Sequence, residues 1–309
     1  QGCALFHEGP ARHSSNKMEW QSLEDEDMEV SCIAVKAHSE VEPEALGEIW
    51  HRKRAVAVEA LQKWEPAVLA DHVCLIVQLL TDQEEQTRRV ALEALAKLEP
   101  LVVAEHVDAI LRRLQDRSWL VRWAALGACC ILEPAILAEH VSTILERLKD
   151  QEGTVRTAAL KVLGNLEPPV LAEHLSTILQ CSEDQDWAVQ RAALEVLGNL
   201  EPSVLENHVT VILQRLEDQD GTLRATALQV LGKLDSSVLA EHISAICQRL
   251  EDPYCFVQQA ALEVLDKLDP ADLAAHISAD QYSLVRLTAL EALGQLELRT
   301  GRKIHLRWP

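Results

Sequence analysis

The stretch LEPAILAEHVSTILERLKDQEGTVRTAALKVLGN, residues 132–165, returns with substitutions every 34 residues along the chain. Histidine marks this period, because each residue of the following series lies 34 positions after the one before: His38, His72, His106, His140, His174, His208, His242 and His276. A fixed period of this length indicates a stack of repeated structural units instead of one globular core. We therefore read the internal repeat before any other feature of the sequence.

Each unit is expected to contain two helices, with residues 150–153 forming the turn between them. In the quoted stretch the first helix begins at Pro134, where the missing N–H of proline costs no hydrogen bond. Spacings of three and four residues then place one apolar face on Leu137, Val141, Ile144, Leu145 and Leu148. A second apolar stripe follows at Val155, Ala159, Val162, Leu163 and Leu166. Gly164 stands near the end of this stripe, where glycine allows a helix to stop.

Neither helix can bury its apolar stripe alone, and a pair still leaves an apolar flank, so each unit requires a neighbour. Further units begin near Pro66, Pro100, Pro134, Pro168, Pro202, Ser236 and Pro270. The first unit is degenerate and the last is shortened, as expected for the two ends of a stack. We predict an acidic non-repeat arm at residues 1–30, the repeats at 31–297 and a basic tail at 298–309.

A turn aspartate is followed six residues later by arginine in several units, and then by Ala-Ala-Leu and Leu-Gly. Examples are Asp116/Arg122, Asp150/Arg156 and Asp218/Arg224. The Trp, Leu-Gly and Tyr pattern of tetratricopeptide repeats is missing, and so is the Thr-Pro-Leu-His of ankyrin repeats. In these residues the chain resembles HEAT-repeat proteins, particularly the HEAT-like repeats of the phycobilin-lyase type.

The resemblance covers roughly residues 31–297 and implies an all-α, right-handed α-solenoid of about eight 34-residue HEAT-like helical hairpins, an armadillo-like superhelix. It implies that the aspartate and arginine of successive units are joined by hydrogen bonds. Gln190 and Gln258 replace the arginine in two units, and those joints are expected to be weaker or differently made. In the family the second helices line a concave groove.

Charge and cysteine usage limit the compartment and the partners. With 29 basic and 49 acidic residues the net charge is −20, which repels nucleic acid and anionic lipid. No apolar run approaches the roughly 20 residues needed to span a bilayer. Eight cysteines lack a C-x-x-C pair, and Cys129 and Cys247 occupy core leucine positions. We expect a soluble protein of a reducing compartment, the cytoplasm or an organelle interior such as the chloroplast stroma, and not a secreted one.

The sequence offers no carrier of catalysis, cofactor binding or metal binding. Helices in a stack lie roughly 8–10 Å apart, so equivalent histidines of neighbouring units cannot share one zinc ion. We expect each imidazole to pack and hydrogen-bond at the joint between units, next to a glutamate: Glu105, Glu139, Glu173 or Glu241. Deoxyhypusine hydroxylase, an enzyme of the HEAT-like family, binds iron through His-Glu pairs, but the repeats here read Glu-His. Nucleophile-elbow, phosphate-loop and dinucleotide motifs are missing.

Partner binding is expected where the outward row of the second helix changes while the scaffold stays constant. This row, at 17, 21 and 25 residues after each histidine, ends in charged pairs in several units: Glu59/Lys63, Glu93/Lys97 and Glu263/Lys267. After His106 the row instead holds Trp123, Gly127 and Ile131, with Trp119 one turn earlier. Exposed aromatic clusters of this kind mark interfaces. The alternative is that these rings fold onto adjacent repeats as additional core.

A second candidate contact lies in the unit after His174, where Trp187 and Arg191 occupy the same offsets as Trp119 and Trp123. We therefore predict a non-catalytic scaffold or accessory subunit that holds a partner protein, whose identity stays open, along its concave groove. Two alternatives stay open: a peripheral subunit of a large assembly, for example a photosynthetic one, and a phycobilin-lyase-like factor for chromophore attachment. For the last, a reactive group could come only from Cys129 or Cys130, beside the two tryptophans.

Overall fold

The computed structural model describes residues 58, 59 and 61–268 and divides into two compact units, Gln1–Ile131 and Leu132–Pro309. We describe each unit by itself. The predicted arm, the degenerate first repeat up to residue 57, the shortened last repeat and the basic tail lie outside the described residues, so their boundaries stay predictions.

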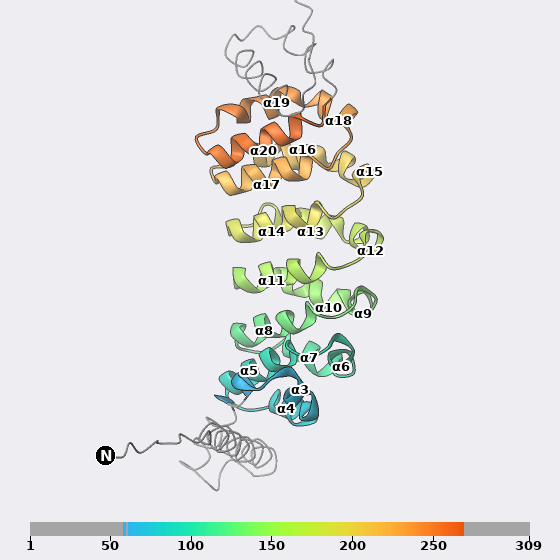
Figure 1. The fold of residues 1–309 in the computed structure, drawn as a ribbon, viewed down its shortest axis with the longest axis vertical. Helices are drawn as coiled ribbons and strands as arrows, with labels where there is room; N and C mark the ends of the chain where they lie inside the picture. Colours follow the sequence, from blue (N-terminus) through green and yellow to red (C-terminus); the bar gives the residue numbers. More distant parts are fainter. Residues whose placement is uncertain (1–57, 60, 269–309) are drawn as a thin grey trace, which may run out of the picture. The chain divides into compact units, whose positions relative to one another are not determined.

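The described part of the first unit contains two complete repeats, each built from two short helices and one longer helix. The first repeat comprises α3 (Pro66–Asp71), α4 (Val73–Leu79) and α5 (Glu85–Leu95). The second comprises α6 (Pro100–Ala104), α7 (Val107–Arg113) and α8 (Trp119–Cys129). The long helices α5 and α8 pack against each other (Figure 1).

The second unit contains four complete repeats within its described residues. The first two comprise α9 (Pro134–Glu139), α10 (Val141–Leu145), η2 (Glu146–Lys149) and α11 (Gly153–Leu163), and then α12 (Pro168–Glu173), α13 (Leu175–Cys181) and α14 (Trp187–Leu197). The third comprises α15 (Pro202–Leu205), η3 (Glu206–His208), α16 (Val209–Gln214), η4 (Arg215–Glu217) and α17 (Gly221–Leu231). The fourth comprises α18 (Ser236–Glu241), α19 (Ile243–Gln248), η5 (Arg249–Glu251) and α20 (Cys255–Leu265). The long helices α11, α14, α17 and α20 pack in sequence order (Figure 1). Six repeats are therefore described, all helical and without a strand in residues 61–268.

The first helix of each repeat is broken at the histidine, so the prediction of one continuous helix is wrong. In the described repeats the histidine has φ between −125° and −110° and ψ between 10° and 15°, outside the helical region. His140 donates its N–H to the carbonyl of Leu137, and its own carbonyl accepts from Thr143. The recurring histidine thus marks the end of one short helix and the start of the next.

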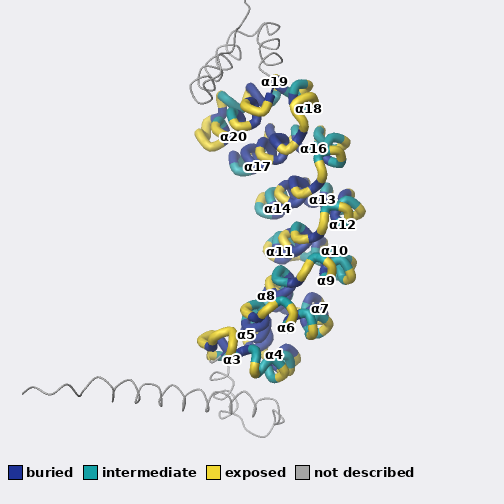
Figure 2. Tube along the Cα trace, turned by 45° about the vertical axis from the view of Figure 1, so that its right-hand side comes forward, coloured by how far each residue is buried: buried dark blue, intermediate teal, exposed yellow. Residues whose placement is uncertain are grey.

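The core lies mainly on the long helices, as the apolar stripe predicts. Figure 2 shows buried positions along α17 in dark blue. In α11, Val155, Ala159, Val162 and Leu163 are all fully buried. Each buried valine or leucine side chain contributes roughly 1.5–3 kcal/mol through burial, and the methyl group of alanine contributes less. The first-helix stripe is only partly buried, because the break at the histidine turns Val141 and Leu145 to half-buried positions.

Glycine follows three of the six described long helices, α11, α14 and α17, for a reason that differs from the prediction. Gly164 follows α11 with φ −62° and ψ −15°, which is ordinary right-handed backbone. A Cβ at Gly164 would lie 3.3 Å from Cγ2 of Val196 in the next long helix. Gly232 has the same 3.3 Å approach to Val264. These glycines therefore permit close packing of successive repeats, and a left-handed cap is not involved.

Polar side chains at the ends of the long helices reach back to the preceding repeat. Lys97 donates to the carbonyl of Gln62 at 3.0 Å, and Asn199 donates to the carbonyl of Gly164 at 3.1 Å. Lys233 and Lys267 donate in the same way to the carbonyls of Gly198 and Gly232. Terminal carbonyls of a helix lack partners within the helix, so these contacts satisfy them.

This arrangement corrects the prediction of glutamate–lysine pairs on the outward row. Glu59 and Lys63 do pair, at 2.6 Å, on an exposed surface. Glu93 instead pairs with Arg89, while Lys97 is used as a cap. In α20 Glu263 accepts from Gln259, and Lys267 is likewise a cap. Of the three predicted pairs, one is formed, and in the other two the lysine bonds to a carbonyl of the preceding repeat instead.

Candidate functional site

The α8 aromatic face consists of Trp119, Trp123, Gly127 and Ile131. Trp119 is the first residue of α8, and Trp123 and Gly127 follow at intervals of four, which places them on one side of the helix. Trp119 is 39% exposed and Trp123 is 43% exposed. Both rings are therefore partly exposed and partly covered by the protein, and neither is fully buried in the core. Ile131 lies just beyond the end of α8 and is half-buried.

Gly127 keeps this face open along its length. It is exposed, and a Cβ built on it meets nothing within 4 Å. Glycine inside a helix is unfavourable relative to alanine by roughly 0.5–1 kcal/mol. No packing contact within the described residues accounts for this glycine, in contrast to those that end the long helices.

Trp187 and Arg191 occupy the matching positions of α14 in the second unit. Trp187 is 52% exposed and opens α14. The guanidinium carbon of Arg191 lies 5.7 Å from the centre of the Trp187 ring, a cation–π contact, and Arg191 also approaches Glu195 at 3.7 Å. This pair and the α8 aromatic face lie in different units, and we treat them as two separate surfaces.

Two exposed aromatic residues were missed by the sequence analysis. Tyr254 and Phe256, at the start of α20, are about half exposed, and their ring centres lie 5.4 Å apart. They fall 12 and 14 residues after His242, outside the row of positions that was compared. Their rings crowd Gly221, whose Cβ would lie 2.7 Å from Tyr254, and Tyr254 covers the guanidinium of Arg224 at 5.8 Å. This pair therefore packs against the preceding repeat while remaining partly exposed.

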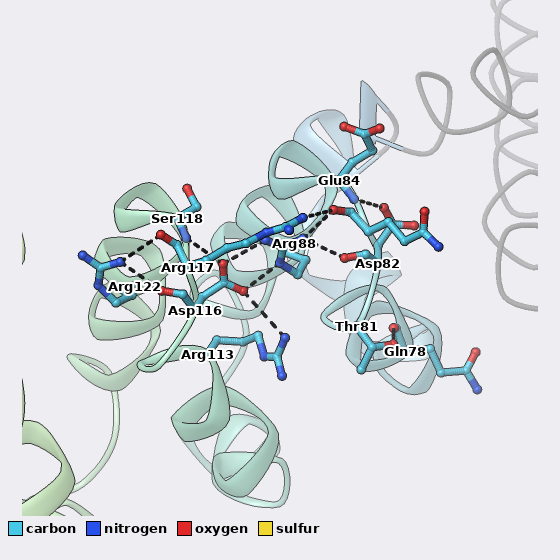
Figure 3. Close-up of polar contacts among 11 residues, drawn as sticks. Gln78, Thr81, Asp82, Glu84, Arg88, Arg113, Asp116, Arg117, Ser118 and Arg122 are labelled. Carbon is cyan, nitrogen blue, oxygen red and sulfur yellow. Dashed lines mark hydrogen bonds and ion pairs between the residues drawn. The ribbon is translucent and has the colours of Figure 1, made fainter. Parts of the chain in front are cut away.

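The arginine ladder joins successive repeats, as the resemblance implied. Arg88 of α5 donates Nε and Nη2 to the two carboxylate oxygens of Asp116, each at 2.8 Å, and Nη1 to the carbonyl of Asp82 at 2.7 Å (Figure 3). The same bidentate contact joins Arg156 to Asp184 and Arg224 to Asp252, at 2.6–2.7 Å. Figure 3 shows Arg88 reaching from its own helix to the turn that precedes α8.

In the described part of the second unit, Gln190 does not bond to the next repeat as the ladder arginines do, which agrees with the expected weaker or different contact. Its amide donates to the carbonyl of Asp184 in its own repeat, but among the described residues it forms no bond to Asp218 of the next repeat. Asp218 instead lies 3.8 Å from Arg215. Gln258 likewise donates to the carbonyl of Asp252 at 2.7 Å, and the residue that would complete its joint lies outside the described range.

These buried carboxylates have lowered pKa values. Burial on its own raises the pKa of Asp116, Asp184 and Asp252, but the hydrogen bonds from the paired arginine and from a backbone N–H, together with the arginine charge, outweigh burial. Each carboxylate is therefore charged at neutral pH and under the acidic conditions where a free aspartate begins to take up a proton.

The lowered pKa of Asp184 predicts a specific pH dependence. A carboxylate whose pKa is lower in the folded state stabilises the fold above its unfolded pKa, roughly 3.9, and this stabilisation disappears as the pH falls through the folded pKa. The difference in unfolding free energy between the wild type and Asp184→Asn should therefore be full near pH 7 and shrink below about pH 4. Urea unfolding followed by circular dichroism measures it. A difference that stays constant from pH 7 to pH 2 would contradict the assignment.

Histidines and cysteines do not assemble into a reactive site within the described residues. No group of three or more histidine, cysteine, aspartate or glutamate side chains there could hold a metal ion. The imidazole of His72 packs edge-on against Trp64 with ring centres 5.2 Å apart, while Glu105, Glu139, Glu173 and Glu241 are exposed. The expected imidazole–glutamate hydrogen bonds are not formed at His106, His140, His174 and His242.

The predicted core cysteines Cys129 and Cys247 are both fully buried, and the six cysteines of the described range are thiols, not disulfides. Burial, with a smaller contribution from neighbouring Cys130, raises the pKa of Cys129 to about 12. Cys129 is therefore protonated at neutral pH and is a poor nucleophile. Within the described range no helix combines the length and the apolar character that crossing a membrane requires.

Comparison with known proteins supports the repeat architecture. The sequence pattern of HEAT repeats matches residues 139–207 and 209–297, slightly more than half of the chain. No curated protein matches the sequence. The phycobilin-lyase type of repeat is not singled out by these comparisons and stays a prediction.

Several known structures share the fold at low sequence identity. An engineered protein is 15% identical with a TM-score of 0.57, over 86% of this chain and 78% of its own. A chain in a homology model of the full-length AP-3 complex is 19% identical with a TM-score of 0.59, over 80% of this chain and 46% of its own. A designed armadillo repeat protein in complex with the peptide (KR)4 is 16% identical with a TM-score of 0.51, over 63% of this chain and 98% of its own.

Three observations indicate the same family: the helical repeats, the arginine–aspartate contacts between them, and the match to the HEAT-repeat sequence pattern. The chain belongs to the HEAT-repeat family, and its fold is an all-α solenoid.

Proposed function

We propose that this chain is a non-catalytic scaffold or accessory subunit that holds a partner protein against its long helices, with the α8 aromatic face as the principal contact. The observation that carries the proposal is the exposure of Trp119 and Trp123 on a helix row that is charged in neighbouring repeats. Tryptophan is enriched among residues that dominate binding energy. The surface of Trp187 and Arg191 is proposed as a further contact.

Structural neighbours support a binding role of this kind. The designed armadillo protein is bound to a peptide, and the AP-3 chain belongs to a multisubunit complex. The second likeness favours, as an alternative, a peripheral subunit of a large assembly. The chromophore-attachment alternative stays open: of its two candidate thiols, Cys129 is fully buried and protonated at neutral pH, whereas Cys130 is only half-buried.

Gly127→Glu tests the proposal without altering a tryptophan. Matching positions in other repeats already hold Glu93, Glu195 and Glu263, and the site at Gly127 has room for a side chain. Replacing a helical glycine should leave stability unchanged or raise it by up to about 1 kcal/mol. A charge in the middle of an apolar interface is unfavourable, so partner binding should fall.

The measurement is quantitative mass spectrometry of proteins captured from native extract by the wild type and by Gly127→Glu. Gln229→Glu, at the matching exposed position of α17, is the control. We expect a partner that is held by the wild type and the control and is depleted at least about tenfold by Gly127→Glu. Equal capture by all three proteins would place the contact elsewhere.

A further inference from the structure

An open, arginine-lined depression of about 610 Å³ lies at the joint between the two described repeats of the first unit. Its lining includes Asp82, Gln83, Arg88, Arg112, Arg113, Gln115, Asp116 and Arg117. Arg88 and Asp116 neutralise each other through their bidentate contact. The remaining lining carries three arginines and one aspartate. On a protein with a net charge of −20, this is a local concentration of positive charge.

The second unit contains a matched depression that shows what the scaffold alone requires. It is lined by Lys149, Asp150, Gln151, Arg156, Glu183, Asp184 and Gln185, and its volume is about 450 Å³. Six of these residues stand 68 positions, two repeats, after counterparts in the first depression, and the arginine–aspartate contact is the same. Here, however, Gln180, Cys181 and Gln185 stand where the first depression has Arg112, Arg113 and Arg117. The contact between arginine and aspartate therefore forms without an arginine at any of these three positions.

The position of Arg112 holds glutamine or glutamate in the other described repeats, and that of Arg117 holds glutamine or proline. Arg113 recurs more often, as Arg147, Arg215 and Arg249, each 3–4 Å from an acidic oxygen. Arg112 and Arg117 are thus the residues that distinguish this depression from the others.

Donor groups in the depression are available for a ligand. The guanidinium of Arg112 forms no hydrogen bond or ion pair to any described residue and is exposed. Arg117 makes one long contact, 3.4 Å, to the carbonyl of Gln83. Arg113 contributes charge more than a free donor, since its Nη1 lies 3.7 Å from Asp116 and its Nε, like that of Arg215 and Arg249 at the same position, is buried without a hydrogen-bond partner in the described part of the chain. Figure 3 shows Arg113 and Arg117 on either side of Asp116.

We propose that this depression binds an oxyanion, a phosphoryl or carboxylate group carried by a side chain of the partner protein. Guanidinium groups bind both through paired, charge-assisted hydrogen bonds. Arg117 lies two residues before Trp119, so a bound segment would meet the basic depression close to the start of the α8 aromatic face. This partner source rests on the proposed function, whereas the oxyanion site itself can be tested on the isolated protein. The acidic body disfavours nucleic acid as the source of the phosphate.

The test is a titration of the ¹⁵N-arginine-labelled full chain with phenyl phosphate and, separately, with phenylacetate, followed through the arginine Nε–H signals at constant ionic strength. The wild type should show saturable shifts of the signals of Arg112, Arg113 and Arg117. Arg112→Gln/Arg117→Gln, which installs the glutamines of the matched depression on exposed positions, should weaken binding at least about tenfold. Arg156 of the matched depression is the internal control and should not shift.

Tighter binding of phenyl phosphate assigns the site to a phosphorylated side chain, and equal or tighter binding of phenylacetate assigns it to an aspartate or glutamate. Shifts that do not saturate, that appear equally at Arg156, or that persist unchanged in Arg112→Gln/Arg117→Gln would overturn the proposal. Such a result leaves the α8 aromatic face unaffected, because Gly127→Glu tests that face independently. Conversely, saturable binding with no effect of Gly127→Glu on the partner would keep the oxyanion site and reject the aromatic contact.

Discussion

Replacing Arg224 with alanine should lower the free energy of unfolding by about 3–5 kcal/mol, since the change leaves a buried carboxylate without its partner. The Arg224 side chain is 8% exposed and that of Asp252 is 3% exposed, and two hydrogen bonds of 2.6 and 2.7 Å join them. Arg224 also donates to the carbonyls of Asp218 and Gln219. Its loss therefore affects both the joint to α20 and the turn of its own repeat.

Urea unfolding followed by circular dichroism at 222 nm measures this loss, and hydrogen exchange locates it. In a linear array each repeat depends on its neighbours, so protection should fall first in α17 and α20. Arg224→Gln is the graded control, because Gln190 and Gln258 keep the bond to the turn carbonyl, and it should be less damaging. Lys63→Ala, which removes an exposed pair, should change stability little. If Arg224→Ala were as stable as Lys63→Ala, the ladder would not hold the repeats together.

Replacing both Trp119 and Trp123 with alanine should weaken partner binding by about 100-fold or more while leaving the fold intact. Tryptophans at the centre of an interface each contribute roughly 2 kcal/mol or more, and 1.4 kcal/mol corresponds to a factor of ten. The two residues are 39% and 43% exposed, so neither is part of the fully buried core.

The measurement for this double variant is the dissociation constant of the captured partner, with helical content checked by circular dichroism. Arg89→Ala, at the position of α5 that matches Trp123, is the control for removing a long side chain from the same row. The Trp119→Phe/Trp123→Phe variant should retain much of the affinity, because apolar contact area is kept. Unchanged affinity in the alanine double variant would return the two rings to a packing role.

The regular spacing of the sequence is enough to predict the repeat and the buried stripe of the long helices, whereas the arginine–aspartate joints followed from the resemblance to HEAT-repeat proteins. Val155, Ala159 and Val162 could be assigned to the core because helical periodicity alone fixes which face they share. The structure confirms this implied contact at Arg88 and Asp116, which stand 28 positions apart.

Features that depend on backbone geometry between elements could not be predicted. The break at His140 and the close approach of Gly164 to Val196 arise from how successive repeats pack, which periodicity does not describe. The lysine caps were missed for the same reason, since Lys97 has a glutamate at i−4 and a carbonyl of the preceding repeat within reach, and only the structure distinguishes them.

The sequence predicted the α8 aromatic face because the outward row, which is charged in several repeats, becomes apolar at Trp123. Residues at other positions of the repeat were missed, because only the outward row was compared between repeats. Tyr254 and Phe256 stand before and at the start of α20, and Arg112 and Arg117 stand in the short helix and turn that precede α8. Comparing every position of the repeat, and not the outward row alone, would have identified all four as departures.

Site-specific photo-crosslinking tests the central claim most directly, because it reports which residue touches the partner. A photoreactive benzophenone amino acid is placed at Trp123, where it preserves an aromatic side chain, and separately at Gln259, the matching exposed position of α20. The account predicts a crosslink to the partner from position 123 and none from position 259. A crosslink from position 259 with none from position 123 would contradict the assignment of the α8 aromatic face as the docking surface.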